Sequence, residues 1–310
     1  MPFAMTSRDF SQITWNPELA DDCRQLVRLA VREDLGRHAD WTTLATVSED
    51  AEGQATMVAR QAGVIAGLVT APVILAEMDI EANWQATVKD GETVNAGQEL
   101  ARLGGRARDL LTAERLLLNF VGHLSGIATM AAAYVQAVEG TGARIYDTRK
   151  TTPGWRRLEK YAVHCGGGFN HRTGLYDAVL IKDNHRMYHQ QQSASESSPA
   201  DLVTRARDFL NQRLPGENQP LLEIEVDNLE QLAEVLVASP DIVMLDNMTP
   251  DQLSVAVAQR NTVAPETELE ASGGISLDSV RSVAETGVER ISVGALTHSA
   301  ASLDVALDWN

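Results

Sequence analysis

Positively charged side chains are concentrated in one stretch of an otherwise acidic chain. Between Arg144 and Arg186 there are nine Lys and Arg residues against four acidic ones, whereas the whole chain carries a formal net charge of −17. A local cationic region attracts small anions, while an acidic remainder repels polyanions such as nucleic acid. The charge distribution therefore favours a small phosphate or carboxylate ligand and argues against a nucleic-acid partner.

Polar and glycine residues stand where the apolar runs of the second half end. These runs are predicted strands, and β/α-barrel enzymes assemble their sites at the carboxyl ends of strands. The residues at those ends are Lys182, Glu225, Asp246, Ser272-Gly273-Gly274 and Gly294. Small residues on the last two strands would expose backbone N–H groups to a phosphate, with a plain glycine turn as the alternative.

Two of these residues, Glu225 and Asp246, are carboxylates without a basic neighbour in the sequence. Two carboxylates beside a phosphate repel it unless Mg²⁺ lies between them. The pair therefore indicates a metal-bound diphosphate or contacts to ribose hydroxyls. A salt bridge to Lys150 or Lys182 is the alternative interpretation.

Arginines suited to a planar anion accompany the carboxylates. Arg115, Arg149 and Arg172 can each bind a carboxylate through two parallel N–H groups, and His171 can donate a hydrogen bond to the same ligand. One such arginine alone is more often a solvated surface charge. The group as a whole indicates a carboxylate site.

The elements that must position these residues alternate between strands and helices. Strands are predicted at 144–147, 178–182, 221–226, 241–246, 268–272 and 290–294, and helices at 229–238, 250–260 and 277–285. This alternation predicts parallel βαβ units. The sequence has no Gly-x-Gly-x-x-Gly turn in this region, which favours a β/α barrel over a dinucleotide-binding fold.

The first half of the chain has a different pattern. A helix is predicted over 21–35, ended by Gly36, after which 40–43 is expected to lead into strands. Short apolar runs and turn signals over 53–103 predict a small sheet-rich domain. A hairpin there resembles those of lipoyl or biotinyl carrier domains. Lys89 does not stand at a hairpin tip between the expected neighbours, so a structural turn is the preferred interpretation.

Composition is that of a globular protein, with 44% hydrophobic and 22% charged residues among 310. Cys23 and Cys165 lack metal-ligand spacing and are too few for a disulfide framework, which favours the cytoplasm, as does the absence of a recognisable secretory signal.

The uncharged stretch 116–138 contains Gly122-x-x-x-Gly126, a spacing seen in membrane helix pairs. Its polar residues favour a helix buried in a soluble core, and no membrane partner is expected.

Residues 190–199 are rich in Gln and Ser and offer no large apolar side chain. Such a composition buries too little apolar surface to offset the entropy of ordering. The segment is predicted to be a mobile excursion on the surface.

A series of motifs connects these observations to a known family. They are Glu33–Gly36 with Asp40–Thr43, Asn119-Phe120 with Leu124–Thr129, Asp147–Thr151, Gly166–Arg172, Ile181–His185, Glu223–Asp227, Leu245–Asn247, Ser272–Gly274 and Val293–His298. In content and order they resemble the quinolinate phosphoribosyltransferase family. The resemblance implies an α/β protein with an N-terminal α/β sandwich domain over 1–117 and an incomplete parallel β/α barrel over 118–297. Residues 298–310 can return to the first domain.

The resemblance also implies an activity and its partners. A pentosyltransferase of this family transfers the phosphoribosyl group of 5-phosphoribosyl 1-diphosphate to quinolinate, with Mg²⁺ as cofactor. Decarboxylation then gives nicotinate mononucleotide, diphosphate and CO₂ in de novo NAD biosynthesis. A homodimer, or a higher assembly of dimers, with shared active sites is implied as well.

The roles implied by the resemblance divide the candidate residues into two sets. The quinolinate set is Arg149, His171, Arg172 and Lys182, with Arg115 arriving from the partner subunit. The set for phosphoribosyl diphosphate and its metal is Lys150, Glu225, Asp246, Ser272, Gly273, Gly294 and His298. Lys150, Lys182, Glu225 and Asp246 are the expected catalytic residues, with Glu225 and Asp246 reaching the metal through diphosphate or water.

Charge explains how such a site works. Departure of diphosphate leaves positive character on the ribose carbon, so the leaving group must be neutralised and the pyridine nitrogen held in line. Other classes stay open: a Schiff-base lyase or aldolase using Lys150 or Lys182, a non-catalytic phosphoribosyl-binding regulator, and a molybdate-associated paralogue that shares part of the motif set.

Overall fold

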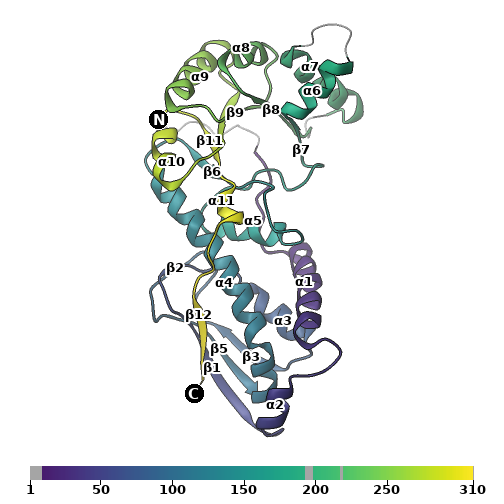
Figure 1. Ribbon diagram of the computed structural model, residues 1–310, viewed down its shortest axis with the longest axis vertical. Helices are drawn as coiled ribbons and strands as arrows, with labels where there is room; N and C mark the ends of the chain where they lie inside the picture. Colours follow the sequence, from purple (N-terminus) through teal and green to yellow (C-terminus); the bar gives the residue numbers. More distant parts are fainter. Residues whose placement is uncertain (1–8, 193–197, 217–218, 310) are drawn as a thin grey trace. The chain divides into compact units, whose positions relative to one another are not determined.

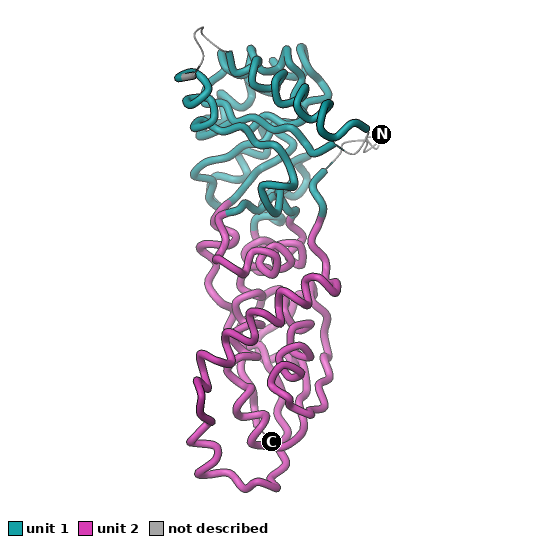
Figure 2. Tube along the Cα trace, turned by 90° about the vertical axis from the view of Figure 1, so that its right-hand side faces the viewer, with its two compact units in different colours: residues 1–11, 134–149, 169–293 teal, residues 12–133, 150–168, 294–310 magenta. Residues whose placement is uncertain are grey.

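The computed structural model (Figure 1) describes residues 9–192, 198–216 and 219–309. Within them the chain forms two compact units (Figure 2). Unit 1 contains residues 1–11, 134–149 and 169–293, and unit 2 contains residues 12–133, 150–168 and 294–310. The predicted domains were 1–117, with 298–310 able to return to it, and 118–297. The units divide the chain differently, because residues 118–133 and 150–168 belong with unit 2.

Unit 1 is built on a six-stranded parallel sheet with the order β6-β11-β10-β9-β8-β7. Its strands are β6 (Arg144–Tyr146), β7 (Ala178–Ile181), β8 (Leu221–Val226), β9 (Ile242–Asp246), β10 (Glu268–Ser272) and β11 (Arg290–Ser292). Among the described residues β6 and β7 are the two edges of this sheet. The predicted α/β class is confirmed, and a parallel β/α sheet that ends in two edges agrees with the predicted incomplete barrel.

Helices connect the strands of unit 1, and α8, α9 and α10 of those given next were predicted, whereas α6 and α7 were not. They are α6 (Asp183–Gln192), α7 (Pro199–Arg213), α8 (Leu229–Val237), α9 (Pro250–Val263) and α10 (Leu277–Ala284). In Figure 1, α8 and α9 lie together on the same side of β8 and β9. Helix α9 begins where Thr249 and Gln252 form a capping box, in which each side chain pairs with the other's backbone N–H.

A short segment after the last turn of α5 (Arg156–Cys165) runs along the edge strand β6. Phe169 forms a parallel bridge with Tyr146, and its backbone N–H donates to Ile145 O (2.8 Å). The Asp147 N–H donates in turn to Phe169 O (3.0 Å). This pairing, absent from the sequence prediction, fixes the residues that follow Phe169.

Unit 2 contains an antiparallel sheet with the order β12-β1-β5-β3. Its strands are β1 (Glu52–Ala59), β3 (Ala82–Ala86), β5 (Glu99–Arg106) and β12 (Val305–Trp309), and β2 (Gly63–Val64) pairs separately with β4 (Thr93–Val94). Its helices include α1 (Pro17–Leu35), α2 (Trp41–Thr46), α3 (Ala71–Glu77), α5 and α11 (Ala295–His298). Because β12 pairs with β1, the carboxyl-terminal residues return to the amino-terminal sheet.

Two local predictions in unit 2 need correction. Helix α1 starts at Pro17, four residues before the predicted start, because Asn16 Oδ1 accepts the Leu19 N–H (2.9 Å) and caps it. The segment after Asp40 is a helix, α2, and not the start of a strand. Asp40 caps that helix by accepting the Thr43 N–H (3.0 Å), a role that short acidic side chains commonly have.

The predicted excursion at 190–199 is also shorter than expected. Helix α6 continues to Gln192, and Ser198 is the N-cap of α7, with a capping box formed with Asp201. Pro199 occupies the first turn of α7, where its missing N–H costs nothing. The rest of the excursion, 193–197, lies outside the described residues.

Helix α4 (Ala107–Ala137) contains the uncharged stretch. It is long and apolar enough to cross a membrane, but 67% of its most apolar window is buried inside the structure. Its polar residue Ser125 has partners inside the protein, because Ser125 Oγ accepts the Ala66 N–H and donates to Ala66 O, both at 3.0 Å. These features are those of a core helix, as the sequence predicted.

The Gly122-x-x-x-Gly126 spacing allows the carboxyl-terminal segment to cross the α4 backbone. The Leu303 N–H donates to Gly122 O (2.9 Å), and a Cβ at position 126 would lie 2.1 Å from Ala301 O. We expect Gly126→Ala to reduce the free energy of unfolding by about 1–3 kcal/mol, because the crossing segment must move away. Chemical denaturation measures this.

The matched control for Gly126→Ala is Gly142→Ala, since a Cβ at position 142 has open space around it. Equal free energies of unfolding of the two variants would show that the close approach at Gly126 does not make a side chain there more costly than at position 142.

Candidate active site

The sheet of unit 1 has one aliphatic face and one charged face. Side chains alternate between faces along each strand, and parallel register aligns them across β8, β9 and β10. The aliphatic row includes Ile224, Val243 and Leu269, and the charged face carries Glu223, Glu225, Asp246, Glu268, Glu270 and Ser272. The candidate site lies at the carboxyl end of the charged face.

Three carboxylates meet at that end. Single oxygens of Glu225, Asp227 and Asp246 lie within 4.8 Å of one another, and we call these residues the strand-end cluster. Lys182 forms an ion pair with Glu225, and Arg186 Nη2 lies 2.6 Å from Asp227 Oδ2. The predicted pair of acids is therefore together, and the alternative salt bridge to Lys182 is present too.

The strand-end cluster has the donor set that Mg²⁺ prefers. Mg²⁺ takes oxygen ligands and usually keeps several waters. Asp227 is exposed and Asp246 half-buried, so water can reach both. A second group, His171, Glu223 and Glu270, has ligand atoms equally close together, but it is buried and leaves no room for a hydration shell.

Loops after β9 and β10 touch beside the cluster. Gly273 (φ +95°) and Gly274 (φ +61°) both adopt left-handed conformations. A Cβ at position 273 would lie 2.2 Å from Asn247 Oδ1, and the Asn247 N–H donates to Ser272 O (2.9 Å). Glycine is therefore required at 273 by both backbone angle and space. Phosphate binding by this turn stays a prediction.

The predicted arginines Arg149 and Arg172 are neighbours in unit 1. Burial lowers the pKa of Arg172, and the positive charge of Arg149 lowers it further. Arg172 Nη1 also donates to Ala178 O (3.0 Å). Two guanidinium groups held close together repel each other, and a bound anion relieves that repulsion. The pair is well suited to a carboxylate.

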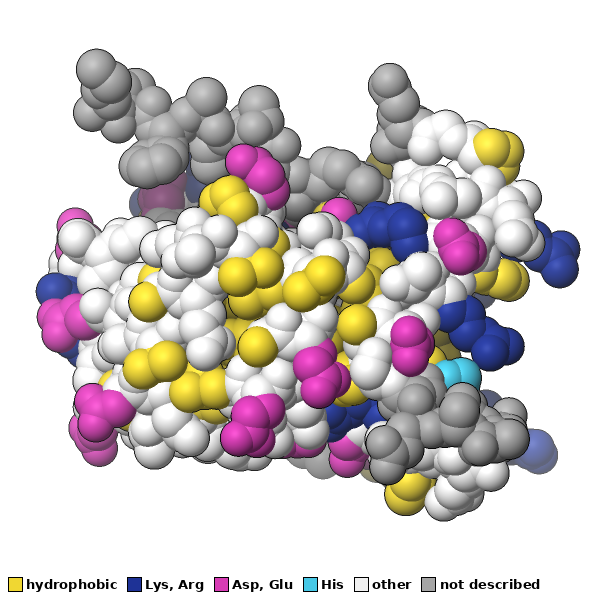
Figure 3. Space-filling model, turned by 90° about the horizontal axis from the view of Figure 1, so that it is seen from above, with side chains coloured by type: hydrophobic (Ala, Val, Ile, Leu, Met, Phe, Trp, Pro, Cys, Tyr) yellow, Lys and Arg dark blue, Asp and Glu magenta, His cyan; other side chains and the backbone are white. Residues whose placement is uncertain are grey.

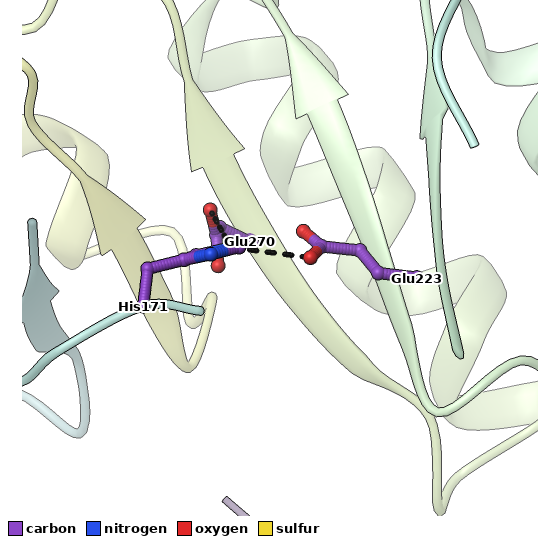
Figure 4. Close-up of side chains that lie close together, drawn as sticks. All are labelled: His171, Glu223 and Glu270. Atoms are coloured by element: carbon purple, nitrogen blue, oxygen red, sulfur yellow. Dashed lines mark ion pairs between the residues drawn. The ribbon is translucent and has the colours of Figure 1, made fainter. Parts of the chain in front are cut away.

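His171 lies inside unit 1, next to this pair. Its Nε2 is 3.1 Å from Glu223 Oε2 and 3.5 Å from Glu270 Oε1 (Figure 4). On the other side of the ring, Nδ1 accepts the Arg172 N–H (2.9 Å).

The two carboxylates change the protonation of this group. Burial acts to lower the pKa of His171, but Glu223 and Glu270 outweigh it and raise that pKa to about 10. Burial also raises the pKa of Glu223, and the positive charge of His171 opposes that rise.

Asp147 fixes the segment that contains Asn170 and His171 through hydrogen bonds. It is fully buried, its Oδ1 accepts the His171 N–H (2.9 Å), and its Oδ2 accepts Asn170 Nδ2 (2.7 Å). Sequence reasoning did not assign site roles to Asp147, Asp227, Glu223 or Glu270. The available signal was acidic residues at alternate positions of otherwise apolar strands, which places them on one buried face.

Three predicted residues lie together in unit 2. A Cβ at Gly294 would be 3.0 Å from Lys150 Cδ and 3.1 Å from His298 Nε2. Thr297 Oγ1 donates to Lys150 O (2.8 Å), which fixes the lysine backbone independently of its side chain. The absence of a side chain at Gly294 leaves space beside the Lys150 and His298 side chains.

Arg115 lines a separate groove of about 590 Å³ in unit 2. The groove is bordered by α4, Trp155 and residues 302–305. Arg115 is exposed, whereas His123 in the same groove lies 3.0 Å from the buried Glu159. An exposed arginine beside an open groove is available to a molecule outside the chain.

The predicted residues thus fall into two sets. Unit 1 holds Arg149, His171, Arg172, Lys182, Glu225, Asp246, Ser272 and Gly273, and unit 2 holds Arg115, Lys150, Gly294 and His298. Carboxylates, a lysine and a glycine turn at the ends of parallel strands are the arrangement of an enzyme of the β/α-barrel type.

Comparison with known proteins gives the family. The profile described as "Quinolinate phosphoribosyl transferase, N-terminal domain" matches residues 40–125, and the one for the C-terminal domain matches residues 127–308. The chain belongs to the quinolinate phosphoribosyltransferase family, which confirms the resemblance found in the motifs.

Individual relatives agree with this assignment. "Nicotinate-nucleotide pyrophosphorylase [carboxylating]" of Mycobacterium leprae is 45% identical over 290 residues, covering 93% of this chain and 97% of that protein. A probable enzyme of the same name from Bacillus subtilis is 39% identical, covering 89% of each. The solved structure of the nicotinate-nucleotide pyrophosphorylase from Francisella tularensis superimposes with a TM-score of 0.86 at 35% identity, covering 97% of this chain and all of that one.

Proposed function

We propose that this chain transfers the phosphoribosyl group of 5-phosphoribosyl 1-diphosphate to quinolinate and releases CO₂, giving nicotinate mononucleotide and diphosphate in de novo NAD biosynthesis. Family membership over most of the chain supports the reaction. The observation that carries the proposal is the joint presence, in unit 1, of the strand-end cluster and the Arg149–Arg172 pair. The strand-end cluster suits a metal-bound diphosphate, and the arginine pair suits a substrate carboxylate.

The proposed roles of the site residues follow from their charges. Arg149 and Arg172 hold a quinolinate carboxylate and orient the pyridine nitrogen toward the ribose carbon. Glu225, Asp246 and their neighbour Asp227 would hold Mg²⁺, which supplies positive charge to the leaving diphosphate when bound. Lys150 adds a second positive charge to the same leaving group.

Decarboxylation needs no further catalytic group. Once the pyridine nitrogen is bonded to ribose it is cationic, and it stabilises the carbanion left when the adjacent carboxylate departs as CO₂. The electron pair of the broken C–C bond takes up a proton at the ring carbon. Cationic side chains around the ring keep the carboxylates ionised until that step.

The test is incubation of the purified protein with quinolinate, 5-phosphoribosyl 1-diphosphate and Mg²⁺. We expect release of CO₂ and formation of nicotinate mononucleotide in equal amounts. Omission of each component in turn is the control. Failure to release CO₂ from the complete mixture would reject the proposal, and product formation unaffected by chelation would reject the role of Mg²⁺.

The proposed partners are small molecules only, and the proposed location is the cytoplasm. Acidic side chains are dispersed over the face of unit 1 seen in Figure 3, in keeping with the net charge of −17. Such a surface repels nucleic acid and anionic lipid. A homodimer, or a higher assembly of dimers, is proposed in addition.

The shared-site dimer leads to a prediction about Arg115. If this exposed residue acts in the partner's site, Arg115→Ala and Lys150→Ala homodimers are each nearly inactive. Co-refolding equal amounts makes about half of the dimers mixed, and each mixed dimer has one intact site. We expect recovery of about a quarter of wild-type activity, measured after co-refolding differently tagged chains.

Each variant refolded alone is the control for this complementation experiment. Mixed dimers are isolated through both tags. If they show no more activity than the controls, Arg115 does not act in the partner's site.

A further inference from the structure

We propose that Asn247 is a positioning residue, whose side-chain amide orients the carboxylate of Asp246 for phosphoribosyl diphosphate. Asn247 directly follows the last residue of β9, and its Nδ2 donates to Asp246 Oδ2 (2.7 Å). None of the roles expected from the motifs falls on Asn247. The inference rests on the proposed function, because it assigns a role beside the strand-end cluster.

The backbone of Asn247 takes a conformation that is unfavourable for most side chains. Its φ is +54°, in the left-handed region, where a Cβ comes too close to the following carbonyl oxygen. This turn ends β9, while the Asn247 N–H still donates to Ser272 O on β10 (2.9 Å). Glycine adopts such angles without that contact, so the turn alone does not require asparagine. What asparagine adds is its amide group.

The amide group is held between Asp246 and the glycine turn that follows β10. A Cβ at position 273 would lie 2.2 Å from Asn247 Oδ1 and 2.6 Å from Asn247 Cγ, so the missing side chain of Gly273 gives the amide its space. A carboxylate accepts hydrogen bonds, so the amide atom that faces Asp246 is the NH₂ nitrogen and the one that faces Gly273 is the oxygen. The orientation of the amide is thereby fixed.

Asp246 differs from the other two members of the strand-end cluster in the group that contacts it. Glu225 forms an ion pair with Lys182, and Asp227 forms one with Arg186. Over the ranges that the structure describes, Asp246 forms no ion pair, and its partner is the neutral amide of the next residue. A neutral partner fixes the direction of the carboxylate and leaves its negative charge for a ligand. Such an acid suits a metal ion or the hydroxyl groups of ribose.

Repulsion within the strand-end cluster makes this support necessary. Single oxygens of Glu225, Asp227 and Asp246 lie within 4.8 Å of one another, and like charges at such distances repel. Asp246 is only half-buried, so its side chain could turn away from the other two acids. The hydrogen bond from Asn247 opposes that rotation before the ligand binds, and preorganisation of this kind improves affinity. Loss of such a supporting contact typically changes metal affinity or activity about 10–100-fold.

The first experiment is Asn247→Gly, which keeps the left-handed backbone and the N–H that reaches Ser272 and removes the amide. We expect the dissociation constant of phosphoribosyl diphosphate, measured by calorimetry with Mg²⁺ present, to rise at least about tenfold. The dissociation constant of quinolinate and the melting temperature are expected to stay unchanged. Unchanged affinity for phosphoribosyl diphosphate would overturn the inference, because asparagine would then serve the turn alone.

The matched control is Ser239→Gly. Ser239 is another left-handed residue of unit 1 (φ +50°), and it precedes β9, so it lies at the opposite end of the strand from Asp246. Both variants replace a left-handed residue with glycine, and we expect Asn247→Gly alone to change the affinity for phosphoribosyl diphosphate. Equal changes in the two variants would overturn the inference.

A second variant, Asn247→Asp, keeps the size of the side chain and places a carboxylate oxygen where the NH₂ group was. It cannot donate to Asp246 and adds a like charge beside it, so we expect it to weaken the binding of phosphoribosyl diphosphate at least as much as Asn247→Gly does. This variant carries the test if Asn247→Gly melts at a lower temperature than the wild type. Wild-type affinity in Asn247→Asp would contradict the inference.

A double-mutant cycle tests whether Asn247 acts through Asp246. In an Asp246→Ala background the amide has no carboxylate to orient, so Asn247→Gly is expected to have no further effect on the dissociation constant of phosphoribosyl diphosphate. Additive effects of the two substitutions would overturn the inference. Because the cycle measures binding, absence of CO₂ release by a wild-type protein that binds phosphoribosyl diphosphate counts against the proposed function and not against the role of Asn247.

Titrations with a chelator in place of Mg²⁺ identify the ligand group that Asp246 meets. A loss of affinity in Asn247→Gly that requires Mg²⁺ supports positioning of Asp246 for the metal-bound diphosphate. A loss that persists with the chelator supports positioning for the ribose hydroxyls. Absence of a loss under both conditions overturns the inference.

Discussion

Replacing Lys150 with alanine is expected to lower turnover by on the order of 10²–10³ and to leave the melting temperature unchanged. In the proposed mechanism the ammonium group neutralises the diphosphate as it leaves, and loss of one preorganised contact of this kind costs about that much in rate. The melting temperature is expected to stay the same because Thr297 Oγ1 donates to the backbone oxygen of Lys150, which an alanine at this position also has. Initial velocities at saturating substrate and thermal melting curves measure the two effects.

The matched control is Lys89→Ala, which removes an exposed lysine from the same unit. Both variants lose one positive charge, so a general effect of net charge on anion binding would appear in each. A Lys150→Ala enzyme that turns over as fast as the Lys89→Ala enzyme would remove Lys150 from the mechanism.

The strands of unit 1 were predictable because their residues are buried on both faces of the sheet. β8 and β10 have the predicted bounds, 221–226 and 268–272. Short segments with apolar residues at least at alternate positions, set between helices with a 3.6-residue period, have few other interpretations. The positions of Glu225, Asp246 and Ser272 at strand ends followed from the same pattern.

The buried ionic groups were not predictable from local sequence. Glu223 and Glu270 belong to different strands, and their common partner His171 comes from a third segment. Only the parallel register of β8, β9 and β10 brings them to one face. A sequence motif identifies a histidine near two arginines, but whether that histidine contacts a ligand or supports an arginine depends on packing.

The second large effect concerns substrate choice: quinolinate is expected to bind at least about 10³-fold more tightly than nicotinate. The site offers Arg149 and Arg172 as neighbours in unit 1, and Arg115 in the partner role proposed above. Nicotinate has one carboxylate, so it leaves cationic groups facing each other without a counter-charge. A site built around polar groups strongly rejects an analogue that leaves them unpaired.

Calorimetric titration with quinolinate, nicotinate and phthalate separates the causes of this preference. Phthalate keeps both carboxylates and lacks the ring nitrogen, so we expect it to bind far more tightly than nicotinate. Arg172→Met removes one cation of the pair. We expect it to weaken the binding of quinolinate much more than the binding of nicotinate, so the dissociation constants of the two acids become more similar. If nicotinate binds the wild-type protein as tightly as quinolinate, the arginine pair does not recognise a second carboxylate, and a related activity on a monocarboxylate becomes the better explanation of the site.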